Sequence, residues 1–166
     1  MKATFKITRK LFETAKNDLL RRHKYAHERV GWLRCRLGDI SESEIVILAH
    51  DYFPVDDNDY IKTSKAAAMI NSSAIRKALQ LVLDKNVSLF HLHLHNHNGS
   101  TTFSGVDRRE NNKLIPDFWN VRPEMPHGAI VFSRTSLTGR CWYQKGTTIN
   151  FSKAIIVGTP IVFIGV

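Results

Sequence analysis

The stretch Phe90–Asp107 (FHLHLHNHNGSTTFSGVD) decides how we expect this chain to fold. It places four histidines at every second position: His91, His93, His95 and His97. Because alternate side chains of an extended strand lie on the same face, these imidazoles could point to one side of a strand over residues 87–95. Ser104 then opens a helix with Asp107 in its first turn. Imidazoles beside a carboxylate predict a metal site and favour zinc.

A catalytic zinc site uses three protein ligands and leaves the fourth position to water. Two histidines two positions apart, together with Asp107, supply these three ligands. The pair can be His93 with His95 or His95 with His97, so His95 is a ligand in either case. The strand length from residue 87 favours the first pair.

A general base must also lie beside the water, and the residues leave two candidates for it. Glu110 lies one turn beyond Asp107 in the expected helix, and Glu28 lies directly before an expected strand. The segment Glu28-Arg-Val-Gly31-Trp-Leu33, the His-x-His pair and Ser104-Gly-Val-Asp107 together resemble the JAMM motif. This motif is typical of MPN/JAB-domain zinc metalloproteases, and the short chain is similar to their bacterial deubiquitinase-like type.

The resemblance implies a role for each matching residue. The two histidines and Asp107 would bind Zn²⁺, Glu28 would be the general base and acid, and Ser104 would stabilise the tetrahedral intermediate. One departure concerns loop length, because the family usually places seven residues between the second His and the Ser. Here eight residues separate His95 from Ser104, and six separate His97 from it. Because family members often read His-x-His-Pro-Gly, the resemblance of His95-Asn-His97-Asn-Gly99 to that string favours the second pair.

The hydrophobic periodicity predicts one α/β domain. We expect strands over 3–7, 30–37, 44–50, 87–95, 129–132 and 138–143, and helices over 9–23, 63–84 and from Ser104 to Pro116. Residues 51–62 read as a connecting loop. The resemblance implies an MPN/JAB (cytidine-deaminase-like) mixed β-sheet flanked by helices over residues 1–153. Residues 154–166 would be a C-terminal hydrophobic strand or the start of a linker.

Composition limits the classes of partner. The chain has 166 residues and a formal net charge of +9, but no nucleic-acid-binding signature accompanies the charge, so we expect no nucleic-acid partner. The apolar run at the C-terminus is shorter than the ~20 residues of a membrane span, so we expect no membrane association. The sequence has two cysteines and begins without an apolar targeting segment, which favours the cytoplasm.

The resemblance implies a zinc-dependent isopeptidase or peptidase. Its substrate would be the amide bond at the C-terminal tail of ubiquitin or a ubiquitin-like protein, in deconjugation or precursor processing. The implied partners are that protein or its conjugate and the E1-like and E2-like enzymes of a bacterial conjugation system. Two alternatives are a non-catalytic MPN-type scaffold and a basic nucleic-acid-associated protein of the same fold.

Overall fold

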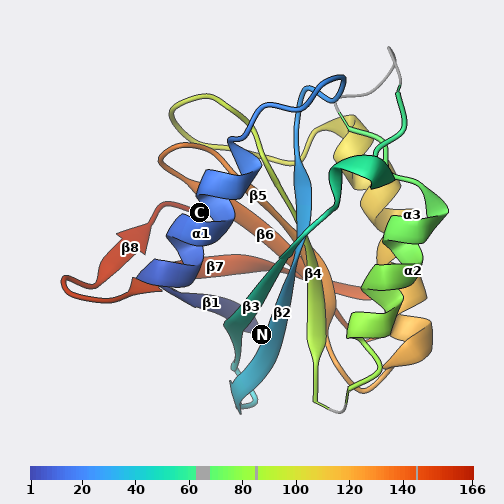
Figure 1. Ribbon diagram of the computed structural model, residues 1–166. Coiled ribbons are helices and arrows are strands. Elements are labelled where there is room, and N and C mark those ends of the chain that lie inside the picture. The colour runs from blue at the N-terminus through green and yellow to red at the C-terminus, as the bar shows by residue number, and fades with distance from the viewer. Residues whose placement is uncertain (63–67, 85, 145) are drawn as a thin grey trace.

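The structure is a computed structural model that describes residues 1–62, 68–84, 86–144 and 146–166. Within these residues eight strands form one mixed sheet, in the order β1-β3-β2-β4-β5-β6-β7-β8 (Figure 1). The strands are β1 (Lys2–Thr8), β2 (Val30–Ile40), β3 (Glu44–Pro54), β4 (Ser88–Leu94), β5 (His127–Phe132), β6 (Leu137–Gln144), β7 (Thr147–Val157) and β8 (Val162–Ile164). The helices are α1 (Arg9–Leu19), α2 (Ser72–Leu81), α3 (Gly105–Val121) and the short 3-10 helix η1 (Asp57–Asp59).

The sheet closes into a barrel of seven strands, because β1 pairs in parallel with β3 on one side and with β7 on the other. Strand β8 pairs with β7 and extends it outside the closed ring. The expectation of an MPN/JAB mixed sheet flanked by helices is therefore wrong. The β1–β7 pairing that overturns it joins the two ends of the chain, and a local hydrophobic period carries no information about such a distant contact.

The barrel interior is the main hydrophobic core. Each strand of the barrel contributes inward-facing apolar side chains, and the rings of Phe5 and Phe151 stack across the β1–β7 seam with centroids 5.3 Å apart. Helix α1 packs into this same core through Ala15 and Leu19. Helices α2 and α3 instead belong to a second core on the outer side of β2 and β4, which includes Ala78 and Phe118.

Several expected boundaries in the first half of the chain are corrected. Helix α1 ends at Leu19, and β3 continues to Pro54, so the first part of the expected loop over 51–62 is paired with β2. The helix expected over 63–84 occupies only Ser72–Leu81, while residues 63–67 of that prediction lie outside the described residues. Asn71 fixes the start of α2, because its side chain accepts a hydrogen bond from the amide of Ala74.

Helix α3 does not end at Pro116, as the sequence led us to expect, but continues to Val121. A proline inside a helix removes one backbone hydrogen bond and disfavours the conformation by about 3 kcal/mol. The buried side chains of Ile115 and Phe118, on either side of the proline, offset this loss by packing in the second core. Helix α3 thereby stays anchored over β4, with its N-terminus at the end of that strand.

In the C-terminal region, the strands expected over 129–132 and 138–143 correspond to β5 and β6, and the turn between them lies at residues 133–136. Residues 154–157 belong to β7, and residues 162–164 form β8. In the parts of the chain described, the helices are all too short or too polar to cross a membrane.

Candidate metal centre

Two of the four alternating histidines lie together at the end of β4. His93 is on the strand and 2% exposed, and His95 follows the last residue of the strand. The amide of His95 still donates to the carbonyl of Phe132 on β5 at 2.8 Å, so the extended geometry continues to this residue. The two side chains therefore share one face, and their Nε2 atoms lie 3.2 Å apart.

Asp107 reaches this pair from the first turn of α3. Its carboxylate oxygens lie 3.4 Å from Nε2 of His93 and 3.5 Å from Nε2 of His95. A capping box holds it there: the amide of Ser104 donates to Asp107 Oδ2 at 2.7 Å, and the amide of Asp107 donates to Ser104 Oγ at 3.1 Å. The spacing of Ser104 and Asp107 in the sequence thus fixes both the start of α3 and the position of the Asp107 carboxylate.

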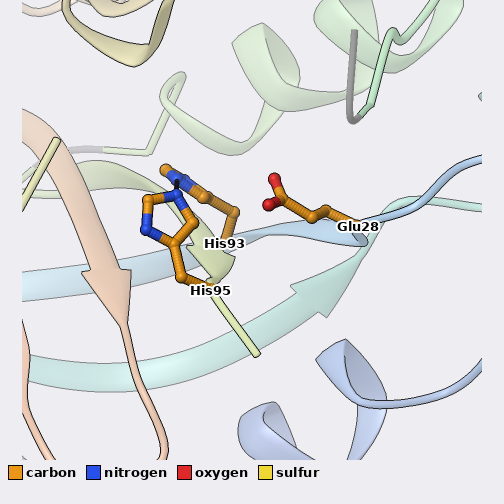
Figure 2. A group of neighbouring side chains, drawn as sticks. All are labelled: Glu28, His93 and His95. Carbon is orange, nitrogen blue, oxygen red and sulfur yellow. Dashed lines mark hydrogen bonds between the residues drawn. The ribbon is translucent and has the colours of Figure 1, made fainter. Parts of the chain in front are cut away.

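Glu28 approaches the pair from a different part of the chain. It lies on the irregular segment directly before β2, and Figure 2 shows its carboxylate pointing toward the two imidazoles. Glu28, His93 and His95 each offer a ligand atom within 4.8 Å of the other two. Strand β2 is antiparallel to β4, with Val30 opposite His93, and this pairing brings the start of one strand to the end of the other.

The glycine of the Glu28 segment has a packing role. A Cβ on Gly31 would lie 2.5 Å from the ring of Tyr52, which crosses the strand at this point and donates its hydroxyl hydrogen to Asp18. Leu33 is fully buried in the barrel core. Gly31 and Leu33 therefore place the start of β2 rather than contribute chemistry.

The electrostatics of the centre favour a neutral ring at His95 beside an ionised carboxylate at Asp107. Burial, and to a smaller extent the neighbouring His93 ring, lower the pKa of His95, so its ring is neutral at neutral pH. Burial would raise the pKa of Asp107, but hydrogen bonds and charge from His93 and the bonds to Ser104 together hold it well below its ordinary value. A neutral imidazole at His95 and an ionised carboxylate at Asp107 are forms that can bind a metal ion.

The outer two histidines of the row have other partners. Nδ1 of His91 lies 3.2 Å from the side-chain oxygen of Asn111 on α3, and burial lowers the pKa of His91 to about 4. His97 is exposed, and its Nδ1 donates to the carbonyl of Asn98 at 2.9 Å. Of the two predicted pairs, the geometry therefore places His93 and His95 beside Asp107. Metal binding by them stays a prediction.

Some residues that shape the centre were missed by sequence reasoning. Thr101 lies next to His95, and the buried Arg29 holds the segment that carries Glu28 by donating to the carbonyls of Arg21 and Arg22. Arg29 also pairs with Asp57 at 2.7 Å. Neither residue belongs to a metal-ligand pattern, and nothing local in the sequence distinguishes them. The other candidate base, Glu110, pairs instead with Arg109 and Lys113 on the exposed side of α3.

The fold and this geometry define a closed mixed β-barrel with a candidate centre of two histidines and two carboxylates. Searches of the sequence against family models and against curated proteins find no match. Among solved structures, the chain is similar to the Trichoplax adhaerens STIL N-terminal domain, with 9% identity and a TM-score of 0.39. The match covers 81% of this chain and 40% of the other. A similarity at this level does not establish a shared fold or function.

Proposed function

We propose that this protein is a zinc-dependent hydrolase of amide bonds, an isopeptidase or peptidase. The observation that carries the proposal is the convergence of His93 Nε2, His95 Nε2 and the Asp107 carboxylate within 3.2–3.5 Å of one another. The carboxylate of Glu28 lies beside the two imidazoles and comes from the segment before β2, not from β4 or α3.

The donor set fits zinc. Two imidazole nitrogens that face each other at 3.2 Å cannot both carry a hydrogen, and a cation between them and a carboxylate would satisfy all three groups. Three protein ligands leave room for a further ligand, as in catalytic zinc sites. When bound, zinc would supply a Lewis acid that polarises a carbonyl oxygen and lowers the pKa of water toward about 7.

Glu28 supplies the proton transfers of this mechanism. Its carboxylate accepts a proton as the oxygen of water adds to the amide carbonyl carbon. It then delivers that proton to the leaving amine as the C–N bond breaks, so the reaction consumes one water and needs no covalent intermediate. A positioned general base of this kind contributes a factor of about 10²–10⁴ in rate.

Ser104 can stabilise the negative charge that develops on the carbonyl oxygen. Its Oγ accepts the hydrogen bond of the helix cap, and a hydroxyl that accepts one bond can still donate its own hydrogen. The side chain is exposed, so this hydrogen is available to a substrate. An oxyanion donor of this kind contributes about 10²–10³ in kcat.

The substrate in this proposal comes from the motif, not from the fold. The residues that resemble the JAMM motif suggest the C-terminal tail of a ubiquitin-like protein, either joined to a lysine or followed by extra residues. E1-like and E2-like enzymes as partners rest on the same resemblance.

The test combines zinc content with cleavage. The full chain is dialysed against zinc and then metal-free buffer, and its zinc is measured together with hydrolysis of ubiquitin-like proteins that carry C-terminal extensions. We expect one zinc per chain and a single cleavage at the tail. Asp107→Asn should lose zinc, because it replaces a charged ligand. A wild-type protein that retains no zinc would sink the proposal.

Glu28→Gln separates the base from the ligands. We expect this variant to keep its zinc and to lose about 10²–10⁴-fold in cleavage rate. Glu110→Gln is the matched control, because Glu110 is an exposed carboxylate paired with Arg109 and Lys113, and its rate should equal that of wild type. A zinc-loaded Glu28→Gln protein that cleaves as fast as wild type would instead support a scaffold or a different base.

A further inference from the structure

We infer that Thr101 is a positioning residue of the metal centre, whose hydroxyl fixes the imidazole of His95 with Nε2 toward Asp107. The inference deepens the proposed function and rests on it. Thr101 lies in the loop between β4 and α3 and is 4% exposed. Its Oγ1 lies 3.3 Å from Nδ1 of His95, on the side of the ring away from the other donors.

The barrel holds Thr101 in place independently of the centre. Its carbonyl accepts a hydrogen bond of 2.5 Å from Oγ1 of Thr138, the second residue of β6. Thr138 pairs with Val131 of β5, and β5 is the direct neighbour of β4. Thr101 is therefore tied to the same sheet that carries His95, so its hydroxyl has a fixed position against which the ring can orient.

The two ligand histidines differ in how their orientation is fixed. Among the residues that the structure describes, Nδ1 of His93 has no hydrogen-bond partner, and the side chain is held by its burial, being only 3% exposed. The side chain of His95 is 19% exposed and lies beyond the end of the strand. His95 is therefore the ligand that depends on a hydrogen bond, and Thr101 supplies it.

The chemistry of the imidazole explains why a hydroxyl suits this position. When Nε2 faces a metal ion it carries no hydrogen, so Nδ1 carries the ring hydrogen and donates it to Thr101 Oγ1. Without metal the ring can adopt the other tautomer, and the same hydroxyl then donates to Nδ1. The hydroxyl thus satisfies Nδ1 in both states, which an apolar side chain cannot do.

The affinity for zinc, measured by competition with a chromogenic chelator, tests this inference. Thr101→Val keeps the shape of the side chain but removes the hydroxyl, and we expect a dissociation constant about 10–100-fold higher. Thr101→Ser should bind zinc as wild type does. Thr102→Val, at the exposed neighbouring threonine, is the matched control and should also match wild type. Equal affinities for Thr101→Val and wild type would overturn the inference.

A second pair keeps the test valid if the valine variant does not fold. Thr101→Ser and Thr101→Ala both lose the methyl group and differ only in the hydroxyl, so packing changes cancel between them. We expect the serine variant to bind zinc about 10–100-fold more tightly than the alanine variant. Equal dissociation constants for the two would contradict a role of the hydroxyl.

Imidazole ¹⁵N spectra of the zinc-free protein separate this inference from the proposed function. We expect Thr101→Ala to shift the Nδ1 signal of His95 and to leave that of His127 in place, because the ring of His127 bonds to Leu89 and Arg122 instead. An unshifted His95 signal would overturn the inference. If wild type binds no zinc, the proposed function fails, while this spectrum still decides whether Thr101 orients His95.

Discussion

Ser104 combines a structural and a chemical role, and three substitutions separate them. The Ser104 hydroxyl caps α3 by accepting the amide of Asp107 at 3.1 Å, and in the proposed reaction the same hydroxyl donates to the oxyanion. Ser104→Ala removes both roles. Ser104→Gly also removes the hydroxyl, but glycine is itself a tolerated N-cap residue. Ser104→Thr keeps both roles.

The loss of the helix cap and the loss of the oxyanion donor should differ in what they change and by how much. Replacing an N-cap serine by alanine lowers the free energy of unfolding by about 1 kcal/mol, whereas glycine lowers it by a few tenths. For a chain of this length, about 1 kcal/mol corresponds to a fall in Tm of about 2–4 °C. Loss of the oxyanion donor, by contrast, lowers kcat by about 10²–10³, whether alanine or glycine replaces the serine.

Urea unfolding and single-turnover cleavage of the zinc-loaded variants measure the two quantities. We expect the alanine variant to be less stable than the glycine variant, with equal losses of kcat, while the threonine variant keeps both stability and kcat. Activities that follow the order of stabilities would refute the chemical role of Ser104. Equal stabilities for the alanine and glycine variants would refute the cap.

Three further predictions concern stability. Gly31→Ala should lower the free energy of unfolding by about 1–3 kcal/mol in urea titrations, because the new Cβ collides with the Tyr52 ring. Burial lowers the pKa of His127 to about 4, so the unfolded chain takes up a proton before the folded one as the pH falls below about 6.5. His127 alone should therefore lower stability by about 3 kcal/mol between pH 6.5 and 4, and His127→Gln should reduce the slope by this contribution. Asp57→Asn should lower stability by about 1–3 kcal/mol, because it leaves the buried Arg29 guanidinium without its counter-charge.

Each of these has a control. Tyr52→Phe in the Gly31→Ala background should leave the collision in place, because the ring and not the hydroxyl alone fills the space. A His127→Gln variant with the same pH slope as wild type would assign that slope to other groups. Combining Arg29→Met with Asp57→Asn should recover part of the loss of Asp57→Asn, and a purely additive double variant would contradict the charge pairing.

The sequence by itself determined the local parts of the centre. Alternation along a strand puts His93 and His95 on one face, and the spacing from Ser104 to Asp107 is that of a capping box. Both follow from the backbone geometry of a few consecutive residues. The strands expected over 87–95 and 30–37 follow in the same way, although the structure has them as 88–94 and 30–40. Such short-range regularities are visible in any sequence that encodes them.

Tertiary structure decided the rest. The closure of the barrel by β1 and β7, the continuation of α3 through Pro116, and the place of Thr101 behind His95 all depend on contacts between distant segments. The choice of His93 over His97 depends on where β4 leaves β5, since His95 is still hydrogen-bonded to Phe132 and His97 lies beyond that bond. Packing between distant segments can offset a local preference at these points, because burying a core side chain stabilises the fold by about as much as a local rule disfavours it.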